Sequence, residues 1–492
     1  MRVLHVCAEV FPLLKTGGLA DVTAALPRAL IARGCDARLL LPGFPAVCAG
    51  IGQRRLIATL PKRFGVAEIR LTLGRLADGV EAYVIEAPVL YDRPGNPYAD
   101  ADNRAYADNH RRFALLGWVA AQLAQGLDPT WQAQVVHAHD WHAGLAPAYL
   151  QASADAQGRR PAASIITVHN LAYQGVFGYE VFHELDLPDD FFGIDGVEFH
   201  GQVSFLKAGL FYADRITTVS PTYAQEIQQS EQGCGLDGLL RTRAAELVGI
   251  LNGVDAAVWS PAQDAAIAAR YDCNTLDGKA ICRTALQSET GLALQDVAPV
   301  FGVVSRLTDQ KGLQLVIGNM EDLLARGGQL VLLGTGDPSL EAAFIALAAA
   351  YPAAVSVEIG YDEAKAHRIV AGCDVILVPS HFEPCGLTQL YGLAYGSLPL
   401  VRRVGGLADS VVDATAANMA DATATGLVFD AFTNEAFAAT VHRAFVLYES
   451  RDAWRKLQQQ AMQQCFDWDA SARKLLDLYE QIAPNVDITD LS

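Results

Sequence analysis

The cysteines of this sequence are few and widely spaced. Nine occur between Cys7 and Cys465, and no two of them form a C-x-x-C pair. This pattern excludes both a zinc ribbon and the disulfide framework of a small secreted domain. We therefore expect free thiols and a cytoplasmic protein.

Basic residues are also in short supply. The chain has 37 Lys and Arg against 55 Asp and Glu, a formal net charge of -18. Attraction to phosphate dominates nucleic-acid binding, so we expect no nucleic-acid partner, and the same argument disfavours anionic membrane surfaces. No run of roughly 20 apolar residues is free of polar interruptions, so we expect no membrane span. An anionic small substrate would need a local cluster of cations.

The sequence is instead rich in apolar residues, arranged in alternating elements. It has 492 residues, of which 51% are hydrophobic, enough for two large domains. A helical pattern over residues 19–33 lies between the first two apolar runs of the chain. The strands predicted in the first half are Val3–Cys7, Arg38–Leu41, Gln134–His137, Ser164–Val168 and Arg215–Val219. This alternation predicts an α/β fold whose parallel sheet has helices on both faces.

The same alternation begins again in the second half. The strands predicted there are Pro299–Val304, Gln329–Leu333, Val355–Ile359, Asp374–Val378, Leu398–Val401 and Gly426–Phe429. Turn residues between Leu251 and Pro261 mark the boundary of two domains, residues 1–250 and 251–467. Two open α/β domains joined by a short linker predict a cleft, with ligands at the carboxyl ends of the strands. The polar stretch Tyr91–Asn109 is too long for an ordinary connection, and we expect it to form a lid.

Polar side chains stand at three predicted strand ends of the first half. The first of these strands is followed by Lys15-Thr16-Gly17-Gly18, which opens a predicted helix. Its glycines allow a ligand to approach the backbone, its helix N-terminus favours anions, and its lysine suits phosphate. The alternative is an ordinary glycine-rich turn. The other two strands end in His137, His139, Asp140 and His142, and in His169 and Asn170. No recognisable ligand set accompanies these histidines, so we expect contacts to a hydroxyl-rich ligand, with satisfied core histidines between them, rather than a metal.

Two strand ends of the second half carry charged groups. Arg306 and Lys311 are two cations suited to a diphosphate, unless both are solvated surface groups. Glu383 follows another strand and precedes a predicted helix start near Thr388, where a carboxylate and free backbone N–H groups could bind a sugar hydroxyl and a phosphate. The alternative is that Glu383 or Thr388 only caps that helix.

Seven stretches together resemble the bacterial glycogen synthases, which are similar to plant starch synthases. They are Lys15–Val22, His137–Leu150, Val168–Gly175, Thr217–Ile227, Val304–Gly312, Pro379–Leu390 and Tyr395–Asp409. The resemblance implies two Rossmann-like domains around a deep cleft, the GT-B glycosyltransferase arrangement. The first domain would lie on the acceptor side and the second on the nucleotide-sugar donor side. Residues 468–492 would form a helix that crosses back to the first domain, and a tail.

The resemblance also implies an activity. It is glucosyl transfer from ADP-glucose to the non-reducing end of an α-1,4-glucan such as glycogen, with retention at the anomeric carbon. Neither a metal nor a cofactor is implied. The residues carried over as catalytic are Glu383 at the sugar, His169 at the glucosyl group, and Arg306, Lys311 and Lys15 at the phosphates.

The remaining site residues are also carried over from the family. Asp21 would order the KTGGL loop, and Tyr361 would lie at the nucleotide base. The further substrate contacts are Thr16, Gly17, Gly18, Cys385, Gly386, Leu387 and Thr388, with Glu9, Asp140 and Asn170 as secondary sugar or acceptor contacts. The sequence departs from the family pattern at Ala24, His381 and Ala394, none of which is a named catalytic group.

Three other functions compete with this one. A related GT-B enzyme could use UDP-glucose or another acceptor, and fold alone does not separate the two. A nicotinamide oxidoreductase is disfavoured because no complete G-x-G-x-x-G with a following acidic residue is present. A silent glucan-binding protein would have no reason to keep the cations and Glu383 together. The sequence predicts no particular oligomeric state.

Overall fold

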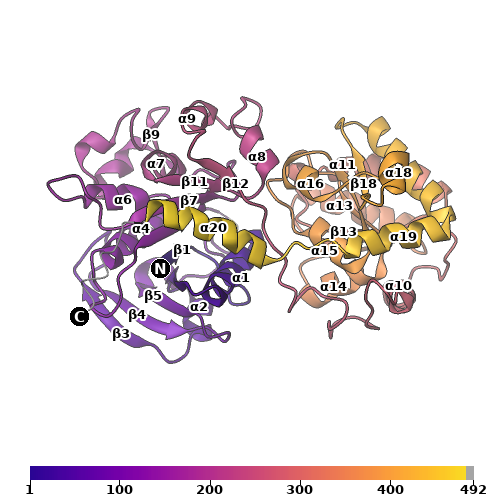
Figure 1. Cartoon of the computed structure of the whole chain (residues 1–492), viewed down its shortest axis with the longest axis horizontal. Coiled ribbons are helices and arrows are strands. Elements are labelled where there is room, and N and C mark those ends of the chain that lie inside the picture. The colour runs from indigo at the N-terminus through magenta and orange to yellow at the C-terminus, as the bar shows by residue number, and fades with distance from the viewer. Residues whose placement is uncertain (103, 484–492) are drawn as a thin grey trace. The chain divides into compact units, whose positions relative to one another are not determined.

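The computed structural model describes residues 1–102 and 104–483, and the chain forms two compact units (Figure 1). Unit 1 contains Met1–Gly253 and the C-terminal segment that begins at Trp468, and unit 2 contains Val254–Asp467. The boundary therefore follows Gly253, three residues beyond the predicted position. The predicted C-terminal tail beyond residue 483 lies outside the described residues.

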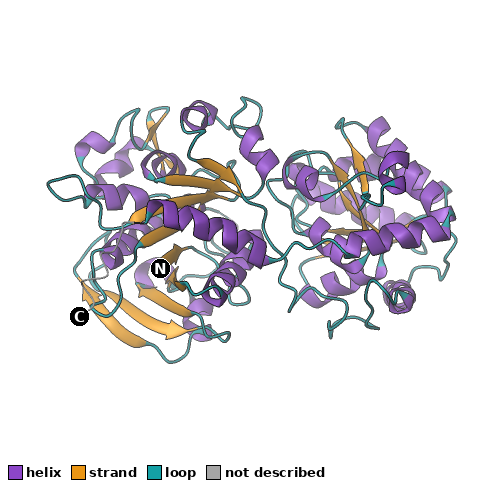
Figure 2. Ribbon diagram, in the orientation of Figure 1, coloured by secondary structure: helices purple, strands orange, loops and turns teal. Residues whose placement is uncertain are grey.

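Unit 1 is built on a nine-stranded sheet (Figure 2). Its strands, in spatial order, are β12 (Leu247–Gly249), β11 (Arg215–Thr218), β7 (Ala163–Val168), β6 (Val135–His139), β1 (Arg2–Val6), β2 (Asp36–Pro42), β5 (Glu81–Glu86), β4 (Ile69–Arg75) and β3 (Arg55–Leu60). Every pairing from β12 to β5 is parallel, which confirms the parallel sheet predicted from the first half. The strands that follow β1 in sequence are added first on one side of it, as β2 and β5, and then on the other side, beginning with β6. The point between β1 and β6 is therefore a topological switch point, where an open sheet of this kind leaves room for a ligand.

The strands at the far edge of this sheet were not predicted. Strands β3 and β4 add to β5 in antiparallel pairings, so the sheet is mixed. The turn between β4 and β5 contains Asp78-Gly79, and Gly79 has a positive φ of 91°. An Asp-Gly pair between alternating apolar residues is a strong hairpin signal, so this edge was readable from the sequence.

Helices enclose the unit 1 sheet. They are α1 (Gly18–Ala32), α2 (Pro45–Gly50), α3 (Pro88–Tyr91), α4 (Asn109–Ala124), α5 (Asp140–Ala143), α6 (Ala146–Ala152), α7 (Phe205–Tyr212), α8 (Pro221–Glu226), α9 (Asp237–Thr242) and α20 (Trp468–Ile482). A small antiparallel sheet and two 3-10 turns lie between α6 and α7; these are β8 (Val176–Phe177), β10 (Gln202–Ser204), β9 (Glu198–Phe199), η1 (Tyr179–Glu184) and η2 (Asp189–Phe191).

Helix α20 lies along α1, although most of the chain separates them in sequence (Figure 1). Trp468 and Leu475 join Leu26 of α1 in one apolar cluster. Arg33 and Asp469 add a two-pronged ion pair with both N–O distances at 2.6 Å. The C-terminal helix therefore packs against α1 as a part of unit 1.

Unit 2 has a six-stranded sheet in which every pairing is parallel. Its spatial order is β15 (Val355–Ile359), β14 (Gln329–Gly334), β13 (Val300–Val304), β16 (Val375–Val378), β17 (Leu398–Arg402) and β18 (Leu427–Phe429). This is the Rossmann strand order 3-2-1-4-5-6, with its switch point between β13 and β16. All six strands were predicted, each to within about one residue at either end.

Helices cover both faces of the unit 2 sheet. They are α10 (Asp277–Thr290), α11 (Leu313–Gly318), α12 (Met320–Ala325), α13 (Pro338–Ala350), α14 (Glu363–Gly372), α15 (Thr388–Tyr395), α16 (Gly405–Ser410), α17 (Ala416–Ala420), α18 (Asn434–Glu449) and α19 (Arg451–Met462), with the turn η3 (Asp309–Lys311). Successive residues of β14 enter different apolar clusters, Leu332 on one face and Val331 on the other. This two-residue period is what a strand buried on both faces requires.

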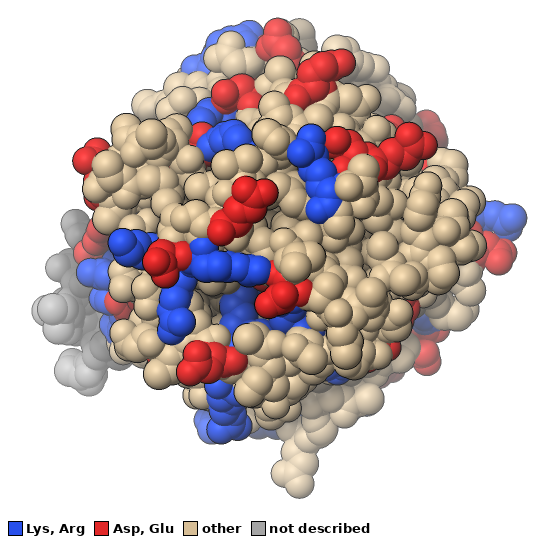
Figure 3. Space-filling view, turned by 90° about the vertical axis from the view of Figure 1, so that its right-hand side faces the viewer, with Lys and Arg blue, Asp and Glu red and all other residues tan. Residues whose placement is uncertain are grey.

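The structure also shows the state of the cysteines, of the most apolar helices and of the charged side chains. All nine cysteines are free thiols, as predicted. No helix within the described part of the chain combines the length and hydrophobicity that a membrane span requires. On the face shown in Figure 3, basic side chains lie beside acidic ones. Unit 2 holds pairs of this kind, such as Arg368 with Glu289 at 2.9 Å.

Candidate active site

The switch point of unit 2 holds an ion pair between a buried carboxylate and a half-buried lysine. Strand β13 leads through Arg306 to Lys311 at the end of η3, and β16 leads to Glu383. Lys311 Nζ lies 2.6 Å from Glu383 Oε2, and Ser380 Oγ donates to the same oxygen at 2.9 Å. The Glu383 side chain is only 6% exposed. The sheet topology thus joins two groups that lie 72 residues apart in sequence.

Glycines allow the backbone to close around this pair. Gly312 follows Lys311 with a φ of 65°, and a Cβ there would overlap the carbonyl oxygen of Pro379. Gly405, after β17, similarly faces the carbonyl oxygen of Glu383, which also accepts a hydrogen bond from the N–H of Gly406 at 3.1 Å. A side chain at either approach would push the Glu383 loop away from β13.

The other unit 2 candidates surround the pair at the same sheet edge. Arg306 is exposed, Cys385 is buried, and Gly386 has a φ of 72°. Leu387 and Thr388 open α15, and Thr388 Oγ1 donates to the Val304 carbonyl at 3.3 Å. Because α15 has no side-chain cap, the helix-cap alternative for Glu383 and Thr388 is wrong. Tyr361 is 63% exposed and lies beyond β15, two strands away from β13.

The KTGGL loop of unit 1 is organised by two carboxylates. Lys15 Nζ lies 3.0 Å from Asp21 Oδ1. Glu9, just after β1, accepts from the N–H and the hydroxyl of Thr16, each at 2.6 Å, and from the hydroxyl of Tyr98. Gly17 precedes α1 in extended backbone, and Gly18 is the first helical residue. The structure therefore places Glu9 and Asp21 inside the loop that presents Lys15.

The predicted lid partly folds onto this site. Tyr98 belongs to the stretch Tyr91–Asn109, in which residue 103 lies outside the described part of the chain. Its ring stacks on His142 with centroids 4.9 Å apart, and its hydroxyl bonds to Glu9. Sequence reasoning missed Tyr98 as a site residue, although a tyrosine within a polar loop was a usable signal.

Asp140 is held at the switch point in an unusual backbone conformation. It begins α5 directly after β6, with a positive φ of 56°. Its Oδ1 accepts from the N–H groups of His169 at 2.8 Å and Asn170 at 3.4 Å, so it fixes the turn after β7. Burial raises the pKa of Asp140 to about 7, although these two hydrogen bonds act in the opposite direction. The arrangement ties together the ends of β6 and β7.

The histidines of unit 1 form a buried hydrogen-bonded network. Ring nitrogens of His5, His137 and His139 lie within 4.8 Å of one another, which is close enough for a metal site. However, His137 Nδ1 lies 2.6 Å from the Tyr479 hydroxyl and its Nε2 lies 2.6 Å from the Thr167 hydroxyl. His137 is thus a satisfied core histidine of the expected kind, and a metal would have to break these bonds.

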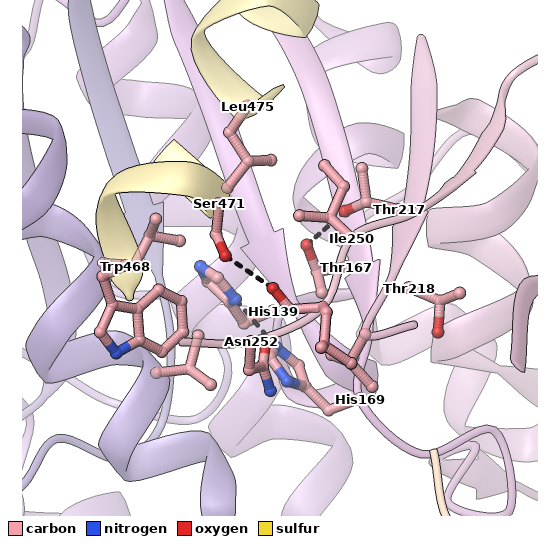
Figure 4. A pocket seen from close by; sticks show the side chains of 14 residues that line it. His139, Thr167, His169, Thr217, Thr218, Ile250, Asn252, Trp468, Ser471 and Leu475 are labelled. Carbon is pink, nitrogen blue, oxygen red and sulfur yellow. Dashed lines mark hydrogen bonds between the residues drawn. The ribbon is translucent and has the colours of Figure 1, made fainter. Parts of the chain in front are cut away.

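A small cavity borders this network (Figure 4). Its volume of about 20 Å³ has room for one water molecule. His139 and His169 point toward each other at its wall, with Trp468 and Ser471 of α20 and with Asn252 beside them. Ser471 Oγ donates to the Leu251 carbonyl at 2.6 Å, so α20 fixes this wall.

The fold and the site define a class of protein: a two-domain GT-B glycosyltransferase. Residues 2–242 match the family described as the starch synthase catalytic domain, and residues 289–461 match the glycosyl transferases of group 1. Glycogen synthase from Francisella philomiragia is 58% identical over 98% of this chain and 100% of its own length. Glycogen synthase from Francisella tularensis subsp. novicida is 56% identical over 98% of this chain and 99% of its own. The chain belongs to the glycogen and starch synthase family.

Solved structures agree with this assignment. The catalytic domain of starch synthase IV from Arabidopsis thaliana, bound to ADP and acarbose, has a TM-score of 0.89 and 30% identity, covering 98% of this chain and 99% of that one. Sucrose-phosphate synthase from Thermosynechococcus elongatus has a TM-score of 0.59 and 17% identity, covering 98% of each chain. The second likeness extends to the fold alone. The resemblance stated from the sequence motifs is confirmed.

Proposed function

We propose that this protein is a glycogen synthase that transfers glucose from ADP-glucose to the non-reducing end of an α-1,4-glucan, with retention of anomeric configuration. The observation that carries the proposal is the pair of Lys311 with the buried Glu383 at the switch point of a Rossmann-ordered sheet. Nucleotide ligands bind at such switch points. Close similarity to glycogen synthases over the full chain, and to a starch synthase structure bound to ADP and acarbose, supports this donor and this acceptor.

In this proposal unit 2 handles the diphosphate. Arg306 and Lys311 would neutralise the charge that grows on the departing ADP, which is where preorganised cations lower a barrier most. Glu383, held by Lys311 and Ser380, would bind sugar hydroxyls and stabilise positive charge near the anomeric carbon. The backbone around Cys385, Gly386, Leu387 and Thr388 would contact phosphate and sugar, and Tyr361 the base.

Unit 1 would recognise the sugar with uncharged groups and would add a cation at the phosphates. His169 would contact the glucosyl group, with Asn170 beside it and Asp140 fixing the turn that carries both. Lys15 would add a cation at the phosphates, presented by the loop of Thr16, Gly17 and Gly18 that Glu9 and Asp21 organise. Burial lowers the pKa of His169 to about 3, which supports a neutral ring at working pH.

We also propose that transfer needs no metal and no cofactor. The Asp100-Ala101-Asp102 sequence has the spacing of a metal-binding carboxylate pair, but its side chains serve their own loop. Asp100 Oδ1 accepts from the N–H groups of Asp102 and Arg104, each at 2.9 Å, and Asp102 is paired with Arg104 at 3.4 Å. The positive charge facing the diphosphate would come from Lys15, Arg306 and Lys311. We place the reaction in the cytoplasm, which the nine free thiols support.

A donor comparison tests the proposed function. Purified full-length protein is incubated with glycogen and radiolabelled ADP-glucose or UDP-glucose, and in a third reaction with NAD and an oxidisable sugar. The expected result is label in glycogen from ADP-glucose at the highest rate, removed by α-1,4-specific amylolysis. Faster transfer from UDP-glucose would move the protein to the related donor class, and reduction of NAD without transfer would contradict the proposal.

A further inference from the structure

Three histidine rings form a single row across the unit 1 sheet. His5 lies in β1, His139 ends β6, and His169 directly follows β7. His5 Nδ1 lies 3.0 Å from His139 Nε2, and His139 Nδ1 lies 3.0 Å from His169 Nε2. His5 and His139 are fully buried. Hydrogen bonds therefore connect the interior of the sheet to the site at its carboxyl edge.

At the inner end of this row, the hydrogen bonds stop at His5. His5 Nε2 is buried and has no hydrogen-bond partner among the described residues. His137 lies close by, but its two nitrogens are engaged by Tyr479 and Thr167, so it offers the row neither a proton nor an acceptor. His5 Nε2 must therefore be either an unpaired N–H donor or an unpaired acceptor.

The unpaired His5 Nε2 determines which ring donates and which accepts along the row. A neutral imidazole has one donor nitrogen and one acceptor nitrogen, so only two arrangements satisfy both contacts. If His169 donates toward the interior, His5 must carry its proton on Nε2, as a buried N–H without an acceptor. In the opposite arrangement His5 Nε2 is only an unfilled acceptor. Unpaired buried N–H groups are the rarer of the two, so the second arrangement is favoured.

Burial keeps all three rings of the row neutral. Burial lowers the pKa of His5 and of His169 to about 3, and burial together with the neighbouring histidines lowers the pKa of His139 well below its usual value. Each ring therefore holds one proton near neutral pH, and the row has one donor and one acceptor at every contact.

We propose that His5 and His139 are positioning residues that fix His169 as its Nδ1–H tautomer. His5 donates to His139, His139 donates to His169 Nε2, and His169 keeps its own proton on Nδ1. That nitrogen is then a hydrogen-bond donor suited to an oxygen lone pair, such as that of a sugar hydroxyl. The functional part of this inference rests on the proposed function, in which His169 contacts the glucosyl group, but the tautomer itself does not.

Nitrogen-15 NMR of the full chain with labelled histidine tests the tautomer directly. Ring nitrogen shifts separate Nδ1–H from Nε2–H imidazoles, and His169→Gln assigns the signals by loss among the 11 histidines. The expected result is Nδ1–H for His5, His139 and His169. Finding His169 as Nε2–H would overturn the proposal, whatever the enzyme proves to transfer.

Kinetics of three variants test the positioning role. His5→Leu removes the inner donor, whereas His5→Asn keeps an amide N–H close to the place of Nδ1. His137→Leu is the matched control, since His137 is equally buried but lies outside the row. Without the inner donor the tautomer of His169 is no longer fixed, so we expect His5→Leu to lower kcat by up to about tenfold, roughly 1.4 kcal/mol.

The pattern among the variants separates positioning from packing. We expect the KM for ADP-glucose to stay within about twofold, His5→Asn to recover at least about a third of kcat, and His137→Leu to lose thermal stability with little loss of kcat. Equal loss of kcat in His5→Leu and His137→Leu, at equal loss of stability, would overturn the role. If His5→Leu does not fold, His5→Asn and the NMR spectrum still decide. Absence of glucosyl transfer by the wild type would instead contradict the proposed function and leave the tautomer result intact.

Discussion

The two units place their candidate groups at the same point of similar sheets but use opposite chemistry. In unit 1 the switch point between β1 and β6 is surrounded by neutral histidines and a carboxyl group whose pKa is raised to about 7 by burial. In unit 2 the switch point between β13 and β16 carries a Lys–Glu ion pair and an exposed arginine. The fold therefore fixes where a site lies, and the side chains decide what it can do there.

The neutral groups of unit 1 and the charged groups of unit 2 suit the sugar and the diphosphate of the proposed substrate, ADP-glucose. A sugar offers uncharged hydroxyl groups, which neutral buried hydrogen-bonding groups can recognise without the cost of burying a charge. A diphosphate requires cations, which remain charged most easily near water. Variants in each unit should accordingly fail in different ways.

The largest expected effect is loss of the unit 2 cations. Arg306→Ala and Lys311→Ala should each lower kcat on the order of 100- to 1000-fold, about 2.7–4 kcal/mol, because these groups act where charge develops. The KM for ADP-glucose should change far less. Arg326→Ala, which removes a surface ion pair with Asp322 in the same unit, is the control. A rise in KM without loss of kcat would assign the cations to ground-state binding instead.

Removing the charge of Glu383 comes next. Glu383→Gln should reduce kcat by more than about tenfold, or roughly 1.4 kcal/mol, while ADP binds nearly as in the wild type. Glu289→Gln, which breaks the exposed pair with Arg368, is the matched control. Retention of more than about a tenth of kcat would remove Glu383 from catalysis, and a trapped glucosyl ester on Glu383 would make this residue a covalent nucleophile instead of a charge-stabilising group.

Acid should distinguish the two units in stability. The pKa values of His5, His142 and His169 are lowered to about 3 by burial, and those of His137 and His139 are also lowered. A lowered histidine pKa gives stability that is present above about pH 6.5 and is lost as the pH falls toward 3. At pH 5 the loss is roughly 2 kcal/mol for each ring whose pKa falls to about 3.

Asp140 acts in the opposite sense. Its raised pKa gives stability that is present below about pH 4 and is lost as the pH rises through about 7, so it offsets part of the histidine effect. Hydrogen exchange at pH 7 and pH 5, corrected for intrinsic rates, should show a greater loss of protection in unit 1 than in unit 2. Asp140→Asn should make that loss steeper. Equal losses in both units would contradict this prediction.

Most of the fold could be predicted because apolar periodicity is local. The unit 2 strand Val355–Ile359 was predicted with its observed bounds. The antiparallel edge of unit 1 was not predicted because β-turn-α-β alternation carries no sign of it; its signal is the Asp78-Gly79 hairpin turn. Each predicted site residue of unit 2 lies at or near a strand end, but the pairing of Lys311 with Glu383 depends on the crossover that makes β13 and β16 neighbours.

The histidine row shows why long-range contacts escape sequence reasoning. His5 lies within an apolar strand and carries no motif signal of its own. Its partner His139 is 134 residues away, and only adjacency of β1 and β6 brings the rings together. Tyr98 was missed for the same reason, since its contact with Glu9 spans 89 residues.

A smaller effect is expected where α20 joins the histidine network. Tyr479→Phe removes the hydroxyl that lies 2.6 Å from His137 Nδ1 and should cost about 1 kcal/mol of unfolding free energy. Urea unfolding monitored by circular dichroism measures it. Tyr351→Phe, at a residue that is 42% exposed, is the control and should change nothing. An unchanged midpoint for Tyr479→Phe would show that this contact adds nothing to stability.

The smallest expected effect is that of chelation. Because the proposal assigns the charge on the diphosphate to protein cations, excess EDTA should leave the transfer rate unchanged. Dialysed enzyme assayed with and without magnesium or manganese provides the measurement. Loss of activity that returns on adding either ion would contradict metal-independent transfer.

The most direct test of the division of labour is ADP binding by His169→Gln, measured by titration calorimetry beside its transfer rate. The proposed phosphate contacts are Arg306, Lys311 and Lys15, whereas His169 is placed at the glucosyl group. We therefore expect an ADP affinity within about twofold of the wild type and a kcat reduced by at least about tenfold. An ADP affinity that falls in parallel with kcat would contradict the account.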